Sequence, residues 1–596
     1  MKMNISFKTL GVGALLSSSL LILSSCEDFL DRPTEDSYNT ENYYSSDAAC
    51  ISGVNYLYNS PWYDFQRGFI KVGEVFSGNM YMGSSPYLNF SVNGTDQDLV
   101  NMSYSLWAEI SHCSTVYESL KGANASQHVK DMCMGECLVW KAMAYFYLVR
   151  SFGDVPLIHD NSATLAKGDY NELQKVQKAD VYDYIILTLQ HAMSLLPKES
   201  QPGRIDYYCA EGLLAKVYLT KAGVTGTLNQ KDLQDAADCA KELLDESLCK
   251  RSLLANYEDV FRGSNNTSPE SLIAWRWTVG PHWTCQNSQQ SDLAIEGFCE
   301  VGSVWGGWGG PSADLMEAFG VVNIEGTGAD ARLVDFPSPE SRADIDTRRK
   351  ATMMLAGDKY SYFWRDKGGF DYLDFIYDSN YNPSATGQLQ GPCGSNNVKH
   401  LYGNTADHVA EMGISDGRMA SALATHILRL SDVYLVYAEA MALLGNGRTT
   451  DKLAVDAYNK VHKRAIPTAA PVSEVTFDMI WKERRLEFAG EGDRWYDYVR
   501  RAYYDVQSCI DELKAQHRNA IWNVNALYKA YYESNRTVWN IVTADGNVEY
   551  DFNTPIPNVT ANSFVLPFPT EDVALNPNVA SDAPAVHVDV FESYKY

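Results

Sequence analysis

The feature that most constrains the fold is a helical spacing of apolar residues that recurs over two long stretches of the chain. Four segments with this spacing, separated by short polar breaks, lie between residues 101 and 260, and three more lie between 424 and 500. Apolar residues three and four positions apart form one face of an α-helix. Short connections between successive amphipathic helices make neighbours antiparallel. The sequence therefore predicts a mainly α-helical protein built from helical hairpins.

The sequence also indicates where these helices end. One run extends from Leu138 to Val149 and is followed by Gly-Asp-Val-Pro at 153–156. In the second stretch the turn Gly-Asn-Gly at 445–447 separates two runs. Glycine and proline directly after a periodic run end a helix. The arrangement is tetratricopeptide-like, although the strict consensus with its fixed Trp, Gly and Pro is not present.

Two regions differ from this pattern. Residues 262–423 are rich in Gly, Ser, Asn, Asp and aromatic residues, and residues 540–596 are polar and contain several prolines. A loop-rich stretch as long as the first is usually functional when it belongs to a compact domain. We therefore expect one domain over 26–596. In it a helical scaffold at about 40–260 and 424–500 supports a loop-rich ligand-binding insert, and C-terminal loops pack on the body.

The N-terminus is typical of an export signal. Lys2 and Lys8 precede an apolar run from Leu10 to Leu23 that is too short to span a membrane. The run ends in Leu-Ser-Ser-Cys26, which resembles the lipobox of bacterial lipoproteins. Residues 1–25 are then a signal peptide, and Cys26 is the lipidated first residue of the mature chain. The alternative is ordinary cleavage with an unrelated cysteine nearby.

The charge of the chain excludes one class of partner. It carries 49 Lys and Arg against 75 Asp and Glu, a net charge of −26. Nucleic-acid binding requires clustered cationic surface, so no nucleic-acid partner is expected. Eleven cysteines follow Cys26, and Cys133 and Cys137 lie one helical turn apart with no His partner. We interpret these two as small buried apolar residues.

No metal site is expected from the sequence. The eleven histidines include no H-E-x-x-H and no pair four residues apart. Asp378, Asn380 and Asn382 imitate the start of a calcium loop, but Pro383 replaces the usual glycine and Leu389 the usual bidentate glutamate. A structural calcium ion is the most that this segment would hold, and no other cofactor is indicated.

Two motifs invite an enzymatic interpretation. Glu483 and Glu487 lie one turn apart, but arginines surround them, which is typical of an ion-paired structural helix. Residues 413–417 fit G-x-S-x-G, yet the preceding residues are polar and do not form the core strand that a nucleophile elbow needs. The sequence therefore predicts a protein that is not an enzyme.

Aromatic residues are the most informative candidates for binding. The chain has 38 Tyr, 21 Phe and 13 Trp. A flat ring can stack on the apolar face of a sugar while polar neighbours bond its hydroxyl groups. Rings among Gly, Pro and Asn in loops are the best placed, whereas the alternative for each is packing against the scaffold. The predicted ligand-binding residues are Tyr81, Tyr87, Asn89, Trp283, Asn287, Trp305 and Trp308.

Five separated blocks resemble the SusD/RagB family of Bacteroidetes outer-membrane lipoproteins. They are the acidic start after the lipobox (26–33), the helix and stop at 135–157, Arg-Leu-Ser-Asp-Val-Tyr-Leu and its continuation at 429–440, Glu-Arg-Arg-Leu-Glu-Phe-Ala-Gly-Glu-Gly-Asp-Arg-Trp-Tyr-Asp at 483–497, and Leu-Pro-Phe-Pro with Asn-Pro at 566–577. Their order along the chain is that of the family.

This resemblance implies a tetratricopeptide-like fold with a loop-rich binding face, and a non-catalytic role in capturing oligo- or polysaccharide at the cell surface. It also implies a lipid anchor at Cys26 in the outer membrane and a SusC-like TonB-dependent transporter as partner. The identity of the sugar does not follow, because the binding loops vary within the family. Three alternatives stay open: a peptide- or protein-scavenging lipoprotein of the RagB type, a surface glycosidase, and a purely structural adaptor.

Overall fold

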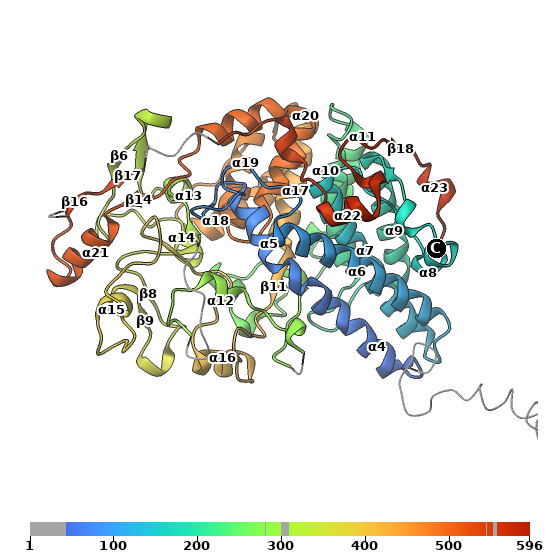
Figure 1. The fold of residues 1–596 in the computed structure, drawn as a ribbon, viewed down its shortest axis with the longest axis horizontal. Coiled ribbons are helices and arrows are strands. Elements are labelled where there is room, and N and C mark those ends of the chain that lie inside the picture. Colours follow the sequence, from blue (N-terminus) through green and yellow to red (C-terminus); the bar gives the residue numbers. More distant parts are fainter. Residues whose placement is uncertain (1–42, 281, 300–308, 544, 552–556) are drawn as a thin grey trace, which may run out of the picture.

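The computed structural model describes residues 43–280, 282–299, 309–543, 545–551 and 557–596. Helices dominate one half of the molecule, and short strands and loops dominate the other (Figure 1). Five helices of the helical half pack in sequence order, each against the next. They are α6 (Gln97–Lys121), α7 (Gln127–Phe152), α9 (Lys178–Leu195), α10 (Tyr207–Lys221) and α11 (Gln230–Leu244). The predicted helical hairpins of the first stretch are thus confirmed.

The central helix of this group is α7. Its composition and length would allow it to cross a membrane, but most of it is buried inside the protein, as expected for a core helix. Cys133 and Cys137 are fully buried within it, which confirms their interpretation as apolar core residues. The helix ends at Gly153, whose φ of 72° is a conformation that glycine adopts without strain.

The second group of helices continues the first across a long insertion. It comprises α17 (Leu430–Leu444), α18 (Lys452–Ala465), α19 (Phe477–Phe488) and α20 (Arg494–Ala515). Helix α17 packs directly against α11, although residues 245–429 separate them in sequence. The insertion is closed at its base by β3 (Ser271–Trp275) and β11 (Thr425–Arg429), which pair antiparallel. Leu430 N extends this pairing by donating to Glu270 O at 2.9 Å.

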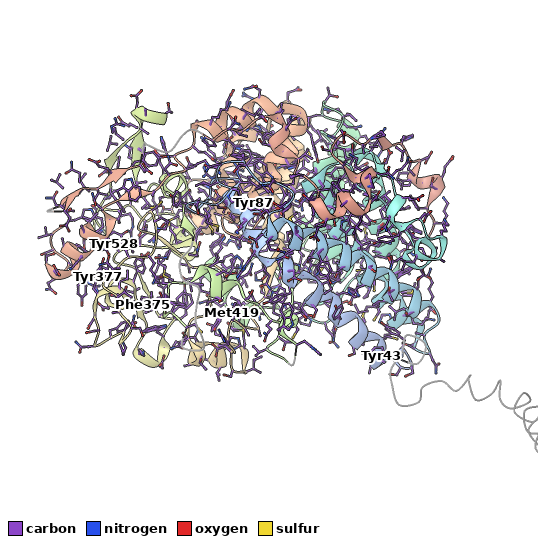
Figure 2. The ribbon with its side chains drawn as sticks, viewed as in Figure 1. Tyr43, Tyr87, Phe375, Tyr377, Met419 and Tyr528 are labelled. Atoms are coloured by element: carbon purple, nitrogen blue, oxygen red, sulfur yellow. The ribbon has the colours of Figure 1, made fainter. Side chains whose placement is uncertain are left out.

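The insert has a hydrophobic core of its own, which the sequence pattern did not reveal. Its elements are too short to show periodicity. Helix α21 (Val524–Glu533) completes this core from outside the insert, and Phe375, Tyr377 and Tyr528 lie together at this end of the molecule (Figure 2). The short elements are α12 (Gln289–Leu293), α13 (Ala313–Ala318), α14 (Thr347–Thr352), α15 (Tyr372–Tyr377) and α16 (Thr405–Met412), with the strand pairs β5 (Asn323–Glu325) with β6 (Arg332–Asp335), β7 (Met353–Met354) with β10 (Asn396–Asn397) and β8 (Lys359–Tyr360) with β9 (Phe370–Asp371).

The C-terminal residues pack on the helical half. Leu566 N donates to Ser151 O at 2.7 Å, and Phe568 stacks on Phe152 with ring centroids 4.9 Å apart. Strand β18 (Ala585–Val586) then pairs in parallel with β2 (Lys175–Val176). Short elements such as α22 (Thr570–Leu575) interrupt these loops.

A buried network of charges joins the insert to the helices. Arg429 at the end of β11 donates to Glu270 at 2.6 Å, to Glu487 at 3.0 Å and to Glu491 at 2.7 Å. Arg464 in α18 contacts Glu270 and Glu487 from the other side. All five side chains are at most 6% exposed. Buried charges persist only when they are paired and hydrogen-bonded in this way.

This network also shows what the two candidate acids of α19 do. Arg348 in α14 donates to Glu483 at 2.7 Å and to Glu487 at 3.3 Å, and His462 bonds the other oxygen of Glu483. The ion-paired interpretation of α19 is confirmed, but the partners come from distant elements rather than from neighbouring turns. Both acids are buried and bonded, so neither is available to a substrate.

Candidate ligand-binding face

Among the described residues, Trp283 is the predicted aromatic site residue that is exposed to solvent. It begins the short helix η7 (Trp283–Cys285) and is 60% exposed. Its ring meets Tyr63 at an interplanar angle of 88°, with centroids 4.6 Å apart. Such an edge-to-face contact fixes the orientation of a ring while leaving much of it uncovered. Thr278 N donates to Cys285 O at 2.9 Å and closes the loop behind it.

Tyr63 belongs to a segment that the sequence analysis did not select. It lies in η2 (Ser60–Phe65), 220 residues before Trp283, and no sequence pattern brings the two together. The following helix α5 (Gln66–Ile70) holds the Trp283 loop in place. Gln66 Oε1 accepts from Ser288 N at 3.0 Å. The contact between the two segments is therefore fixed by side-chain bonds to backbone.

A charged pair lies near Tyr63. Arg67 donates from Nε and Nη2 to the two carboxylate oxygens of Asp292, at 2.9 and 3.0 Å. The Asp292 side chain is nearly buried, but that of Arg67 is 49% exposed. A bidentate pair holds its guanidinium in one plane, and the remaining donors of Arg67 stay accessible. The face thus combines a ring for stacking with a fixed polar edge, which is the combination that a sugar requires.

Asn287 supports this face from below and does not belong to its surface. It is 2% exposed, and its Nδ2 donates to Leu423 O at 2.8 Å. Its backbone exchanges two hydrogen bonds of 3.0 Å with Ser421. The prediction of Asn287 as a ligand-binding residue is therefore wrong, because its side chain is buried and these bonds anchor the Trp283 loop to the segment before β11.

Tyr87 is likewise a core residue. Its side chain is fully buried, its hydroxyl donates to Asp96 at 2.8 Å and its ring packs edge-on against Phe76. Figure 2 places it in the middle of the molecule. Burial and the adjacent Asp96 raise the pKa of Tyr87. The prediction that this ring stacks on a sugar is wrong. Asn89, two residues later, is exposed.

Tyr81 stays a candidate because it is only partly buried. It lies in β1 (Met80–Tyr81), which pairs antiparallel with β4 (Gly310–Pro311). The predicted residues Trp305 and Trp308 precede β4 and lie outside the described residues. A Cβ on Gly310 would lie 2.8 Å from Ser395 O. The close approach of the backbone at this position therefore requires glycine.

The other predicted motifs show no catalytic geometry. Ser415 of G-x-S-x-G lies in an exposed turn after α16, with a helix rather than a strand before it. In the calcium-like segment, Asp378 Oδ1 accepts from Asn380 N at 2.8 Å and Asn382 Oδ1 from Ser384 N at 3.1 Å. Both oxygens thus stabilise the turn itself.

One group of metal-binding residue types does occur among the described residues, formed by Asp314, Glu317 and His517. Both ring nitrogens of His517 already have partners: Nδ1 bonds Glu317 at 2.6 Å and Nε2 bonds Gly326 O at 2.9 Å. Burial alone would lower the pKa of His517, but these two acceptors raise it. The group is best described as a histidine whose two ring nitrogens are already bonded to protein oxygens.

Comparison with known proteins identifies the family. Residues 287–584 match the model of the SusD family, and residues 28–219 match a model described as "Starch-binding associating with outer membrane". A SusD-like protein of Bacteroides ovatus is 30% identical over 581 residues, which is 94% of this chain and 96% of that protein. The chain belongs to the SusD family. This confirms the resemblance seen in the sequence.

The solved structures agree with the SusD fold. A crystal structure with xylogluco-oligosaccharide has 27% identity and a TM-score of 0.74, covering 91% of this chain and 100% of that one. A SusD-like carbohydrate-binding protein from Bacteroides fragilis has 18% identity and a TM-score of 0.63, over 90% of this chain and 100% of that one. The mainly helical, tetratricopeptide-like fold is thus confirmed. The prediction that the chain is a binding protein rather than an enzyme agrees with its membership of this family.

Proposed function

We propose that this SusD-like protein is a cell-surface lipoprotein, anchored to the outer membrane at Cys26, that binds oligo- or polysaccharide through the face around Trp283. It delivers the bound glycan to a SusC-like TonB-dependent transporter and performs no catalysis. The outer-membrane association is supported by the description of the family model that matches residues 28–219.

The observation that carries this proposal is the state of Trp283. A tryptophan that is 60% exposed lacks most of the stabilisation that burial of its ring would give. Its presence on an ordered loop therefore favours a ligand that covers it. Tyr63 supports the ring, and Arg67 supplies donors near Tyr63. Stacking on one side and charge-fixed hydrogen bonding on the other suit a carbohydrate better than an extended peptide, which would need an unpaired strand edge or an apolar groove.

Binding calorimetry with residues 27–596 tests the proposal. The panel begins with xylogluco-oligosaccharides, the ligand in the solved relative at 27% identity, and continues with other neutral glycans and with peptides. We expect one glycan class to bind and Trp283→Ala to weaken it about tenfold, roughly 1.4 kcal/mol. Trp522→Ala is the matched control, because Trp522 is 52% exposed on β14 (Ile521–Trp522), next to the hydrophobic core of the insert.

The outcomes separate the alternatives. Binding of peptides with no glycan bound would replace the proposal with the scavenging role of a RagB-type lipoprotein. Release of shorter sugars during the titration would replace it with a glycosidase. Equal effects of Trp283→Ala and Trp522→Ala on affinity would remove the binding site from Trp283.

A further inference from the structure

A pocket in the insert is lined by lysines from three separate elements. Lys350 comes from α14, Lys359 from β8 and Lys367 from the short helix η9 (Arg365–Lys367). The cavity measures about 410 Å³, which is within the range of pockets that take small ligands. We call it the lysine pocket. None of its lining residues belongs to the Trp283 face.

Two of the three ammonium groups lack an ionic partner. Within the described part of the chain, neither Lys350 nor Lys367 has a carboxylate oxygen within 4.0 Å. Instead, Lys350 Nζ lies 5.2 Å from the ring centroid of Tyr360, and Lys367 Nζ lies 4.4 Å from that of Trp364. Aromatic faces hold the two cations in place but do not neutralise them. This is unusual in a chain whose net charge is −26.

The acids that line the pocket are already engaged. Asp371 accepts two hydrogen bonds from Arg536, at 2.8 and 2.9 Å, and pairs with Lys359 at 3.0 Å. Asp374 accepts from the same arginine at 2.6 Å. The remaining acid, Glu258, lies near the hydroxyl of Tyr362 and helps to raise the pKa of that tyrosine. Three lysines and three carboxylates therefore line the pocket. Because Asp371 and Asp374 are already bonded to Arg536, an incoming anion can pair with Lys350 and Lys367.

The walls of the pocket suit a ring-shaped ligand. Tyr362 and Tyr381 are partly exposed along it. The hydroxyl of Tyr381 donates to Gly369 O at 2.6 Å, which fixes the glycine turn that forms one side. Gly368 and Gly369 have φ values of 84° and 108°, so a side chain there would be strained and the backbone stays bare. A ligand can thus approach main-chain groups and aromatic edges at the same time.

We propose that the lysine pocket binds a saccharide unit bearing a carboxylate, a uronic acid. Its carboxylate would lie between the ammonium groups of Lys350 and Lys367, and its ring against the tyrosines. Compact ammonium groups on flexible stems suit a single anionic group that can arrive in several orientations. The saccharide part rests on the proposed function, whereas the anion selectivity follows from the pocket alone.

Calorimetry with a galacturonate tetramer and its fully methyl-esterified form tests the proposal, because the two probes share their rings and differ in charge. We expect the acid form to bind more tightly and to weaken at high salt. Lys350→Gln combined with Lys367→Gln should weaken the acid form about tenfold and leave the ester unchanged. Lys514→Gln, an exposed lysine on α20, is the matched control and should change neither.

Three results would overturn the proposal. The first is equal binding of acid and ester, the second an unaltered affinity in the double variant. The third is inorganic phosphate displacing the tetramer at equal concentration, since that shows an anion site without recognition of the sugar. Trp283→Ala is read in parallel with a neutral glycan, so that failure of the proposed function and failure of the lysine pocket appear in different titrations.

Discussion

The helical half and the insert use the same residue types in opposite ways. Around the core of the helical half, charged and aromatic side chains face inward and are bonded, as Arg429 at the end of β11 and Tyr87 in the turn before α6 are. On the insert and the segments that brace it, Trp283 and Lys367 stay exposed. Both arrangements give similar sequence patterns of aromatic and charged residues. The difference shows that binding is indicated by a side chain whose interactions are left unsatisfied.

The largest effect is expected where the inward arrangement is broken. Arg429→Met removes the cation that faces Glu270, Glu487 and Glu491 and leaves three buried carboxylates in close contact. We expect a loss of about 3–5 kcal/mol in the free energy of unfolding, measured by urea denaturation. The matched control is Arg448→Met, whose exposed pair with Glu474 at 3.6 Å should contribute less than about 1 kcal/mol.

An equal loss in both variants would mean that the buried network contributes no more than a surface pair. At urea concentrations below its unfolding transition, the Arg429→Met variant should still bind glycan at the Trp283 face. Loss of that binding together with retained stability would instead place Arg429 in the site.

Acidification should also destabilise the helical half. Burial lowers the pKa of His400 and of His426 to about 4. Burial alone would raise the pKa of Glu491, but Arg429 and Lys399 outweigh it and lower the pKa to about 2. In each case the unfolded chain binds protons more readily, so stability falls as the pH falls. Each of the two histidines, whose pKa falls from 6.5 to about 4, should contribute a loss of about 3 kcal/mol between pH 7 and pH 4, beginning at about pH 6.5.

Thermal unfolding followed by calorimetry across this pH range checks the expectation. His426→Gln should flatten the dependence of the melting temperature on pH near pH 6, because glutamine keeps a hydrogen-bonding group but does not titrate. A melting temperature that rises on acidification would contradict the assignment.

The sequence predicted the scaffold well because helical periodicity is a local signal. Its helices and the stop at Gly153 follow from neighbouring residues, whereas the ion pairs of α19 were expected within the helix and are instead made with distant elements. The core of the insert was missed, since it is assembled from two- to eight-residue elements and from α21, far along the chain. For the site, exposure of Trp283 agrees with its loop context, yet Tyr87 and Asn287 stand in equally polar contexts and are buried. Tyr63 was missed because only tertiary packing brings it to Trp283.

A smaller effect is expected at Tyr87, which the sequence analysis assigned to the ligand surface although it is a core residue. Tyr87→Phe removes the hydroxyl that donates to Asp96 at 2.8 Å, while Asp96 continues to cap α6 through Leu99 N at 3.0 Å. A buried hydrogen bond to a charged group contributes about 1.5 kcal/mol, so we expect a loss of that size in urea denaturation. Glycan affinity should not change. Weaker binding at unaltered stability would return Tyr87 to the ligand surface.

The smallest effect should come from substitution of Tyr63. It tests whether the exposed ring of Trp283 needs the contact with Tyr63 in order to bind glycan. Tyr63→Leu keeps the apolar volume beneath Trp283 but removes the edge-to-face contact at 4.6 Å. Such a contact contributes about 0.5–1.5 kcal/mol. We expect glycan affinity to fall about threefold to fivefold, with Trp283 fluorescence reporting a more mobile ring, and stability to change by less than about 1 kcal/mol. Because the variant matters only through Trp283, it should have no further effect in the Trp283→Ala background. Additive losses in the double variant would show instead that Tyr63 contacts the glycan directly.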